Sequence, residues 1–247
     1  GISPHRAVLL TLAKLFDSPL YNLKLLKIFY KMGFQPSNKT FFSLMKNISS
    51  KEEWEAWAPE LDVIERPSIQ LRTLILSKKI ALTTEKNQPL PTSIMQEVDL
   101  LLSNSVTQSS DGEVENIVIR IGIQKLFDTI ARQGFAKELS QLFSKFPNVF
   151  LHQKNFFFSE LVAQTLIGYR HPQEQDITQA AIAFINDTIH SHHLCMIVIN
   201  QILSMVGHCN GQAQQIFEYL CQKGFPVKNN KRTQSIMQKF HKQRLQE

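Results

Sequence analysis

The chain has 247 residues and a formal net charge of +6, and 43% of its residues are hydrophobic, including 17 Phe. This composition supports a sizeable buried core and excludes wholesale disorder. With only 9 Gly and 10 Pro, the chain has too few turn residues for an all-β sandwich or barrel. We expect no membrane span, because no apolar run reaches the required length, and no signal peptide in residues 1–10.

The charge is unevenly distributed along the sequence. Residues 1–46 contain seven Lys or Arg and one acid, and residues 223–246 contain seven Lys or Arg and no acid. The stretch between them, 47–222, has 13 bases and 19 acids, which gives a net charge of −6. Basic ends attract phosphate groups or an acidic partner surface, whereas a plain Lys-rich helix face serves solubility.

Serines mark the start of the first helices. Ser3-Pro4 and Ser18-Pro19 each combine a capping hydroxyl with a proline that suits the first turn of a helix. Ser37 precedes a third amphipathic stretch. Because the first two helices are joined so closely, we expect them to form an antiparallel hairpin.

The next two helices have equally clear signals. Ser50 and Glu53 form the pattern of a capping box, followed by two Trp on one face of a short helix that we expect Pro59 to end. Pro67-Ser68 opens a longer helix to about residue 84. A loop with two prolines then leads to a helix that ends near residue 104.

Residues 105–116 are polar and contain Ser109-Ser110-Asp111-Gly112. This composition predicts a mobile loop or a boundary between two halves. We therefore expect an N-terminal helical half over residues 1–104 and a C-terminal helical half over residues 117–247, within one continuous domain.

The segment 117–123 fits two patterns. Its isoleucines alternate as in a strand, but Ile119, Ile123, Phe127 and Ile130 also form a helical stripe, and the length of the pattern favours a helix. Six further helices are expected over residues 136–146 (ended by Pro147), 156–169, 176–190, 194–206, 212–223 and 231–244. The predicted fold is all-α, with antiparallel helical hairpins stacked as an α-solenoid or packed as an irregular helical bundle.

One phrase recurs three times: an apolar residue and Phe, a short spacer, then Gly-Phe. The copies contain Gly33-Phe34, Gly134-Phe135 and Gly224-Phe225. In each copy we expect the glycine to end a helix in the left-handed conformation, with the following Phe packed back on the last turn. The irregular spacing between the copies gives no repeat period, so a common type of helix end also explains them.

Two of the copies extend over residues 26–45 and 213–237, and both resemble the second helix, turn and next first helix of a pentatricopeptide repeat. The resemblance implies a superhelix of the pentatricopeptide or tetratricopeptide kind. In the pentatricopeptide family, polar residues of the first helix read single-stranded RNA bases. Matching the phrase places Phe42 and Thr233 at the main base-reading position, a role that suits Thr233 and not Phe42.

Two runs of phenylalanine are candidates for partner binding. Phe156, Phe157 and Phe158 cannot all face one core at 100° per residue, and Phe41-Phe42 presents the same choice. If one of these Phe side chains is exposed, it is a candidate contact for a partner. The alternative is that all of them are buried between two layers of helices.

The C-terminal stretch interleaves basic and aromatic residues, a pattern that holds phosphates and stacks on bases. The alternative is the polar end cap of a solenoid. The candidate nucleic-acid-binding residues are Lys228, Lys231, Arg232, Thr233, Lys239, Lys242 and Arg244.

Cysteine and histidine do not point to a metal site. Cys195, Cys209 and Cys221 are an odd, clustered trio, which indicates free thiols and a reducing compartment such as the cytoplasm, the nucleus or an organelle matrix. The His-rich group around Cys195 is separated from His208-Cys209 by a helix about 20 Å long, too far to share one ion. We expect no metal.

No sequence motif points to catalysis. The chain contains neither a Gly-rich phosphate loop nor a nucleophile elbow, so we expect no cofactor. The sequence therefore predicts a non-catalytic helical-repeat scaffold that binds a protein partner. The alternatives are a single-stranded RNA-binding module that uses the basic ends, and an enzyme with an unfamiliar helical active site.

Overall fold

A computed structural model describes residues 11, 18–34, 36–64, 66–86, 88–106, 117–151, 158–174, 176–191, 194–209 and 212–244. In these ranges the chain forms thirteen α-helices, one 3-10 helix and no strand. The predicted all-α class is confirmed, and residues 117–123 belong to a helix. The predicted helix after Ser3 lies outside the described residues.

The helices have the following bounds: α2 Pro19–Lys31, α3 Asn38–Met45, α4 Lys51–Leu61, α5 Ile69–Thr83, α6 Thr92–Val106, α7 Ile117–Arg132, α8 Ala136–Lys145, α9 Pro147–Leu151, α10 Glu160–Arg170, α11 Ile177–Ser191, α12 Met196–His208, α13 Ala213–Gln222, the 3-10 helix η1 Pro226–Asn229, and α14 Lys231–Arg244.

The serine start signals act as predicted in α2, α3, α4 and α5. Each serine hydroxyl accepts a hydrogen bond from the backbone N–H three residues later, and so satisfies a donor that the first turn leaves free. In the capping box of α4, Glu53 Oε2 also accepts from the backbone N–H of Ser50 at 3.2 Å. The four capping serines are Ser18, Ser37, Ser50 and Ser68.

The three Gly-Phe helix ends are also confirmed. The glycines have φ values of 81°, 84° and 82°, in the region that favours glycine. The N–H of each following Phe donates to the carbonyl five residues earlier, at 2.9, 3.2 and 3.0 Å for Phe34, Phe135 and Phe225. At the first of these ends, the ring of Phe34 meets that of Phe29 edge-on, with 5.7 Å between centroids.

Three predicted boundaries differ from the structure. Pro59 lies inside α4, which continues to Leu61. The proline removes one backbone hydrogen bond, but it lies in the last turn, so little of the helix depends on that bond. Pro147 ends α8 but also opens α9, since proline suits the first helical position. The helix predicted from Phe156 starts only at Glu160, after the capping serine Ser159.

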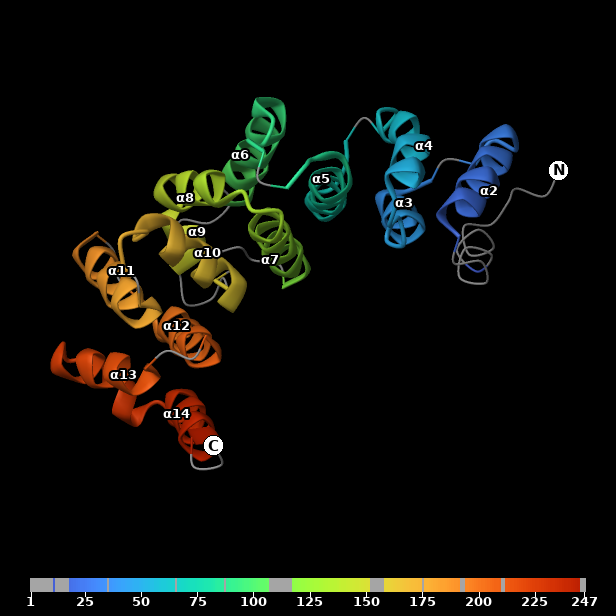
Figure 1. Cartoon of the computed structure of the whole chain (residues 1–247). Helices are drawn as coiled ribbons and strands as arrows, with labels where there is room; N and C mark the ends of the chain where they lie inside the picture. Colours follow the sequence, from blue (N-terminus) through green and yellow to red (C-terminus); the bar gives the residue numbers. More distant parts are fainter. Residues whose placement is uncertain are drawn as a thin grey trace.

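The helices from α5 onward lie in two rows along a curved path (Figure 1). One row contains α5, α7, α10, α12 and α14, each of which contacts the next. Helices α6, α8, α11 and α13 lie on the outer side of the curve, where they cover the first row. The arrangement is compatible with the predicted stacking of antiparallel hairpins.

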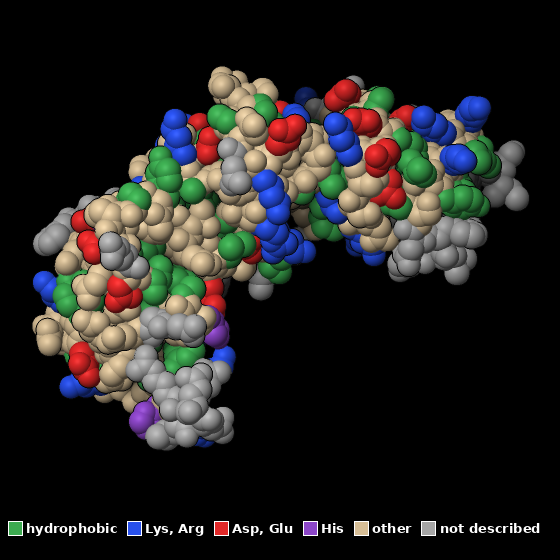
Figure 2. Space-filling view, viewed as in Figure 1, with side chains coloured by type: hydrophobic (Ala, Val, Ile, Leu, Met, Phe, Trp, Pro, Cys, Tyr) green, Lys and Arg blue, Asp and Glu red, His purple; other side chains and the backbone are tan. Residues whose placement is uncertain are grey.

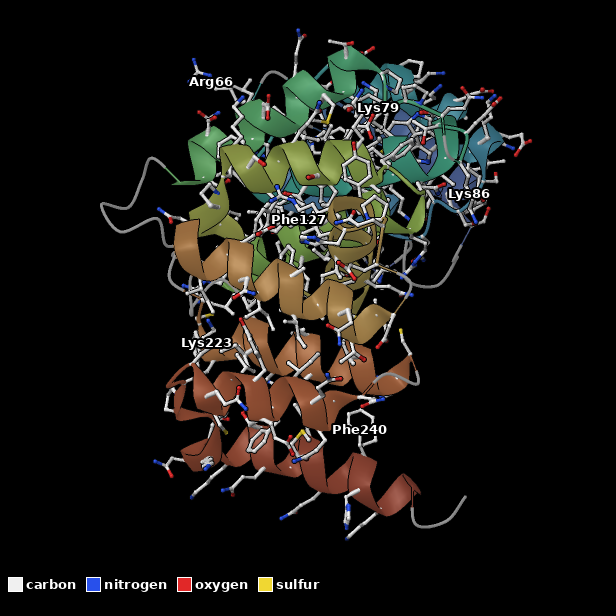
Figure 3. The ribbon with its side chains drawn as sticks, turned by 60° about the vertical axis from the view of Figure 1, so that its left-hand side comes forward. Arg66, Lys79, Lys86, Phe127, Lys223 and Phe240 are labelled. Atoms are coloured by element: carbon white, nitrogen blue, oxygen red, sulfur yellow. The ribbon has the colours of Figure 1, made fainter. Side chains whose placement is uncertain are left out.

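Two buried clusters hold this array together. The N-terminal cluster is formed by α2, α3, α4 and the start of α5, and it contains Trp57 and Leu71. The main cluster runs from Leu76 to Phe240. The side chain of Phe240 lies between α14 and the rest of the stack (Figure 3). Helix α5 contributes Leu71 to the N-terminal cluster and Leu76 and Ile80 to the main cluster. Of the predicted loop at 105–116, residues 107–116 lie outside the described ranges, so the division into two halves stays a prediction.

Helices α5 and α7 approach each other closely. A Cβ atom on Gly122 would lie 3.2 Å from Cγ2 of Thr73, a tight contact. Glycine in α7 therefore permits the approach that joins α5 to the main cluster.

Candidate functional site

The phenylalanines predicted to contact a partner are largely buried. Phe41 is 3% exposed and Phe158 is 1% exposed, so their prediction as exposed contacts is wrong. Phe158 packs against Phe143 and Phe184, with centroids 6.5 and 6.0 Å apart. Burial between helix layers, the alternative reading, explains both residues. Phe42 is half-buried against the N-terminal cluster, and Phe156 and Phe157 lie outside the described residues.

The candidate RNA-binding residues fall into two groups. The first group lies on η1 and α14 and has exposed side chains: Lys228, Lys231, Arg232, Lys239 and Lys242. Arg244 is the last residue of α14.

Thr233 is buried completely, so its predicted role as a base reader is wrong. Its hydroxyl donates to Asn200 Oδ1 at 2.7 Å, and its backbone N–H donates to Asn230 Oδ1 at 3.0 Å. Thr233 therefore fixes the start of α14 against α12.

A polar network connects α10, α12 and α14. Glu160 accepts hydrogen bonds from Ser204 at 2.7 Å and from Nδ1 of His208 at 2.8 Å. The ammonium of Lys239 lies 3.2 Å from Nε2 of His208, so the imidazole lies between the carboxylate of Glu160 and this lysine. Burial raises the pKa of Glu160, but the hydrogen bonds from Ser204 and His208 outweigh it, and the pKa lies below its usual value.

The cysteines and histidines that the structure describes do not meet at a common point. His208 is engaged with Glu160 and Lys239, while Cys195 is half-buried against the main cluster. Burial, with a smaller contribution from Glu160, raises the pKa of the Cys209 thiol and disfavours the reactive thiolate. Within the described residues, no three His, Cys, Asp or Glu side chains form a group that could hold a metal ion. His192 and His193 lie outside those residues.

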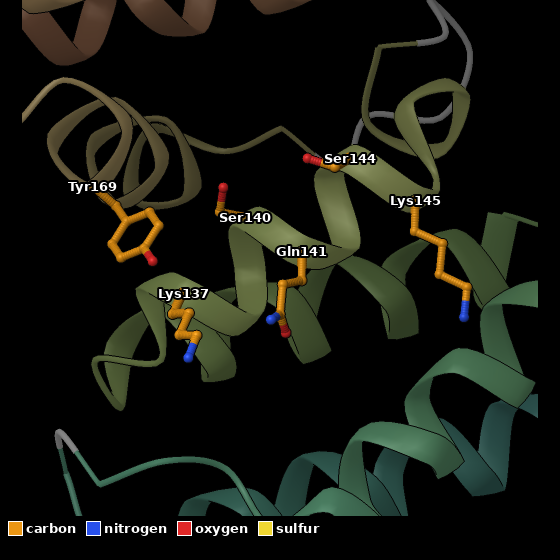
Figure 4. Close-up of a pocket in the computed structure, with 6 residues that line it drawn as sticks. All are labelled: Lys137, Ser140, Gln141, Ser144, Lys145 and Tyr169. Atoms are coloured by element: carbon orange, nitrogen blue, oxygen red, sulfur yellow. The ribbon is translucent and has the colours of Figure 1, made fainter.

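A shallow, open groove of about 480 Å³ lies between α8 and the end of α10. Figure 4 shows three α8 side chains projecting along one side of the helix and two serines nearer α10, with Tyr169 on α10 opposite them. Sequence reasoning missed this groove because its residues form no motif. The groove is lined by Lys137, Ser140, Gln141, Ser144, Lys145 and Tyr169.

The guanidinium of Arg170 lies beside this groove. It donates to Ser140 Oγ at 3.0 Å, to the Ser140 carbonyl at 3.2 Å and to Ser144 Oγ at 2.6 Å. It also lies over the ring of Phe143, 4.7 Å from the centroid. Burial lowers the pKa of Arg170, and the charge of Asp187 opposes this effect. Arg170 therefore lies next to the groove and is held by two of the serines that line it.

The second feature that sequence reasoning missed is an exposed apolar ridge on α2. Leu20, Ile28 and Met32, the C-cap residue, are 42%, 52% and 54% exposed, and at 100° per residue they fall within a band of about 120° on one side of the helix. Lys24 lies between them and is also exposed. Figure 2 shows hydrophobic and basic side chains together at this end of the molecule. The signal was present in the sequence, because these residues lie outside the stripe that α2 buries.

Within the described residues, no helix combines the length and apolarity needed to cross a membrane. A comparison with models of protein families finds no match for the chain, and a search of curated proteins finds no similar sequence.

Proposed function

We propose that this chain is a non-catalytic helical scaffold that binds a protein partner. The observation that carries the proposal is the exposed apolar ridge of α2, formed by Leu20, Ile28 and Met32. Several large apolar side chains exposed on one side of a helix, among polar and charged residues, are a candidate protein interaction site. The curved double row of helices presents an elongated surface next to it (Figure 1).

The ridge has the chemistry of a protein interface. Full burial of an exposed Ile, Leu or Met side chain is worth about 1.5–3 kcal/mol, so three such residues supply an anchor for a partner. Lys24 and Lys31 are exposed beside the apolar side chains, which favours a partner whose complementary face is apolar with acidic residues at its rim.

The test is quantitative affinity capture with the full chain. We expect the double variant Ile28→Asp with Met32→Asp to lose the specific partner that the wild type retains, without a change in Tm, because both side chains are more than half exposed. The matched control is Val63→Asp, which places the same charge on another exposed apolar residue, 68% exposed and just after α4. If the double variant retains the same partners as Val63→Asp, the ridge is not the interface.

Binding of single-stranded RNA is a second candidate function, favoured by the exposed bases on η1 and α14. We expect Lys231→Glu with Arg232→Glu to weaken binding of a labelled single-stranded RNA, measured by anisotropy at two salt concentrations. The control pair, Arg66→Glu with Lys86→Glu, makes the same charge change on exposed residues elsewhere in the array (Figure 3). Equal RNA binding by both double variants would eliminate α14 as the nucleic-acid interface.

A further inference from the structure

We propose that the groove between α8 and α10 binds an extended acidic segment of a protein partner, with two carboxylates on Lys137 and Lys145. This inference rests on the proposed scaffold function and names a second contact surface for it. The groove is separate from the apolar ridge of α2 in both sequence and structure (Figure 1).

The spacing of the cations sets the spacing of the acids. Lys137, Gln141 and Lys145 recur every fourth residue of α8 and project along one side of it (Figure 4). Eight residues of helix place the two lysines about 12 Å apart at 1.5 Å per residue. An extended peptide rises about 3.3 Å per residue, so acidic residues four positions apart match the two lysines.

The floor of the groove adds polar groups between the lysines. Ser140 and Ser144 form the adjacent line on α8, and both hydroxyls accept hydrogen bonds from Arg170. Because a hydroxyl also has a proton to donate, each serine can donate to a peptide carbonyl while it accepts from the guanidinium. The positive charge of Arg170 increases the attraction for an anionic segment.

The walls of the groove are open to an incoming peptide. Lys137 is exposed, and Tyr169 is 44% exposed and offers an aromatic surface for the stem of an acidic side chain. Lys145 pairs with Asp99 at 2.7 Å, and its side chain is 55% exposed. Exposed pairs of this kind contribute about 0–1 kcal/mol, so a peptide carboxylate can share this lysine.

The acid on α8 does not oppose such a ligand. Glu138 accepts a hydrogen bond from the backbone N–H of Leu90 at 3.3 Å and is not among the groove residues. Its carboxylate stabilises the loop before α6.

The same observations favour a peptide over RNA at this groove. Two lysines about 12 Å apart match two separate charges, whereas RNA carries a charge on every phosphate. The stretch 47–222 around the groove has a net charge of −6, which repels a polyanion more strongly than a peptide with two acids. Among the described residues, Tyr169 is the one aromatic residue that lines the groove, and sequence-tolerant binding of single strands uses a series of aromatic rings.

The test is fluorescence anisotropy of the full chain with synthetic Gly/Ser peptides. One peptide carries Glu at its first and fifth positions, one carries Glu at adjacent positions, and one carries Gln in place of both acids. We expect the first peptide to bind about fivefold more tightly than the other two, and the preference to fall at high salt. Equal binding of all three peptides would overturn the proposal, as would tighter binding of a labelled single-stranded RNA that depends on the same lysines.

The protein variants locate the site. We expect Lys137→Gln with Lys145→Gln to remove the preference for the first peptide, and Arg66→Gln with Lys86→Gln, an equal loss of charge on exposed residues away from the groove, to retain it. A retained preference in the groove variant would place the peptide elsewhere and overturn the proposal. The scaffold function is tested separately by the α2 variants: loss of a partner by the α2 double variant without any peptide preference in the wild type would reject only the groove.

Discussion

The N-terminal and C-terminal regions of the molecule solve the same folding problem by different means. Among the described residues, the cluster formed by α2, α3, α4 and the start of α5 buries eleven hydrophobic residues, whereas the main cluster buries forty. All four helices of the smaller region begin with a serine whose hydroxyl caps the first turn. In this region, a small hydrophobic core is therefore combined with a hydrogen-bonded cap at the start of every helix.

The larger region uses such caps at some helix starts, where Ser159, Asp176 and Asn230 accept from the first turns of α10, α11 and α14. Helices α8, α12 and α13 have the N-cap residues Phe135, Cys195 and Gln212, none of which makes a side-chain hydrogen bond to the first turn. Helix α12 nonetheless buries seven residues. The comparison teaches that capping and tertiary burial are alternative sources of helix stability, because packing of the apolar face supplies most of the stability of helices in proteins.

The largest expected effect comes from removal of a core aromatic residue in either region. Trp57 is fully buried, and its Nε1 donates to the carbonyl of Pro19 at 3.0 Å, so it ties α4 to the start of α2. We expect Trp57→Ala to cost about 3–5 kcal/mol and to remove hydrogen-exchange protection from α2, α3 and α4 while α10 to α14 stay protected. As the counterpart, Phe127→Ala should remove protection from the main cluster. Uniform loss across the chain in both variants would show one cooperative unit.

The next effect tests how α14 is attached. A Cβ on Gly207 would lie 2.2 Å from the ring of Phe240, so Gly207→Ala forces the ring out of its position on α12. We expect a cost of about 1–3 kcal/mol, with faster hydrogen exchange confined to α14. The control is Gly168→Ala, where nothing lies within 4 Å of the added Cβ and the variant should be neutral or slightly stabilised. Equal Tm values for the two variants would contradict the close packing of Phe240 against Gly207.

A smaller effect is expected at the cap of α4. Ser50→Ala removes the hydroxyl that accepts from the N–H of Glu53 at 3.2 Å, and we expect a loss of about 1 kcal/mol in chemical denaturation. Ser43→Ala is the control, because that hydroxyl donates only to the carbonyl of Lys39 within its own helix and should contribute less than about 0.5 kcal/mol. If both substitutions have the same effect, the small region does not depend on its caps.

The smallest effect is a dependence on pH in the network around Glu160. Because its pKa lies below the usual value, ionised Glu160 adds stability above the ordinary range of Glu, and that stability is lost as the pH falls through the lowered pKa. The wild type should therefore melt above Glu160→Gln near neutral pH, by the equivalent of less than about 1 kcal/mol, and the two should converge in acid. A difference in Tm that is constant with pH would show that packing alone distinguishes them.

Short-range signals in the sequence predicted much of the fold. The cap at Ser50 and the ends at Gly33, Gly134 and Gly224 depend on hydrogen bonds between residues close together in the chain, so the sequence displays them directly. Pro59 and Pro147 were placed less well, because proline both starts and ends helices and its role depends on the turn it occupies.

The candidate sites were predicted poorly because they depend on contacts between distant residues. Phe41 and Phe158 are buried by helices that are distant in the sequence. Thr233 is buried as well, and its hydroxyl donates a hydrogen bond to Asn200 on another helix. The serines of the groove on α8 accept hydrogen bonds from Arg170, which lies 30 residues after Ser140. No spacing pattern links those two residues, so only the packing of α10 on α8 reveals the site.

Helix α5 has a geometric consequence for the whole array, since Leu71 belongs to one buried cluster and Leu76 to the other. Five residues along a helix correspond to a rotation of about 140° around its axis. Leu74, Ile75 and Leu82 pack against the same cluster as Leu71, whereas Ile80 belongs with Leu76. At 100° per residue these two sets fall on opposite sides of α5, so a single helix serves both hydrophobic interiors and its position fixes how they lie relative to each other.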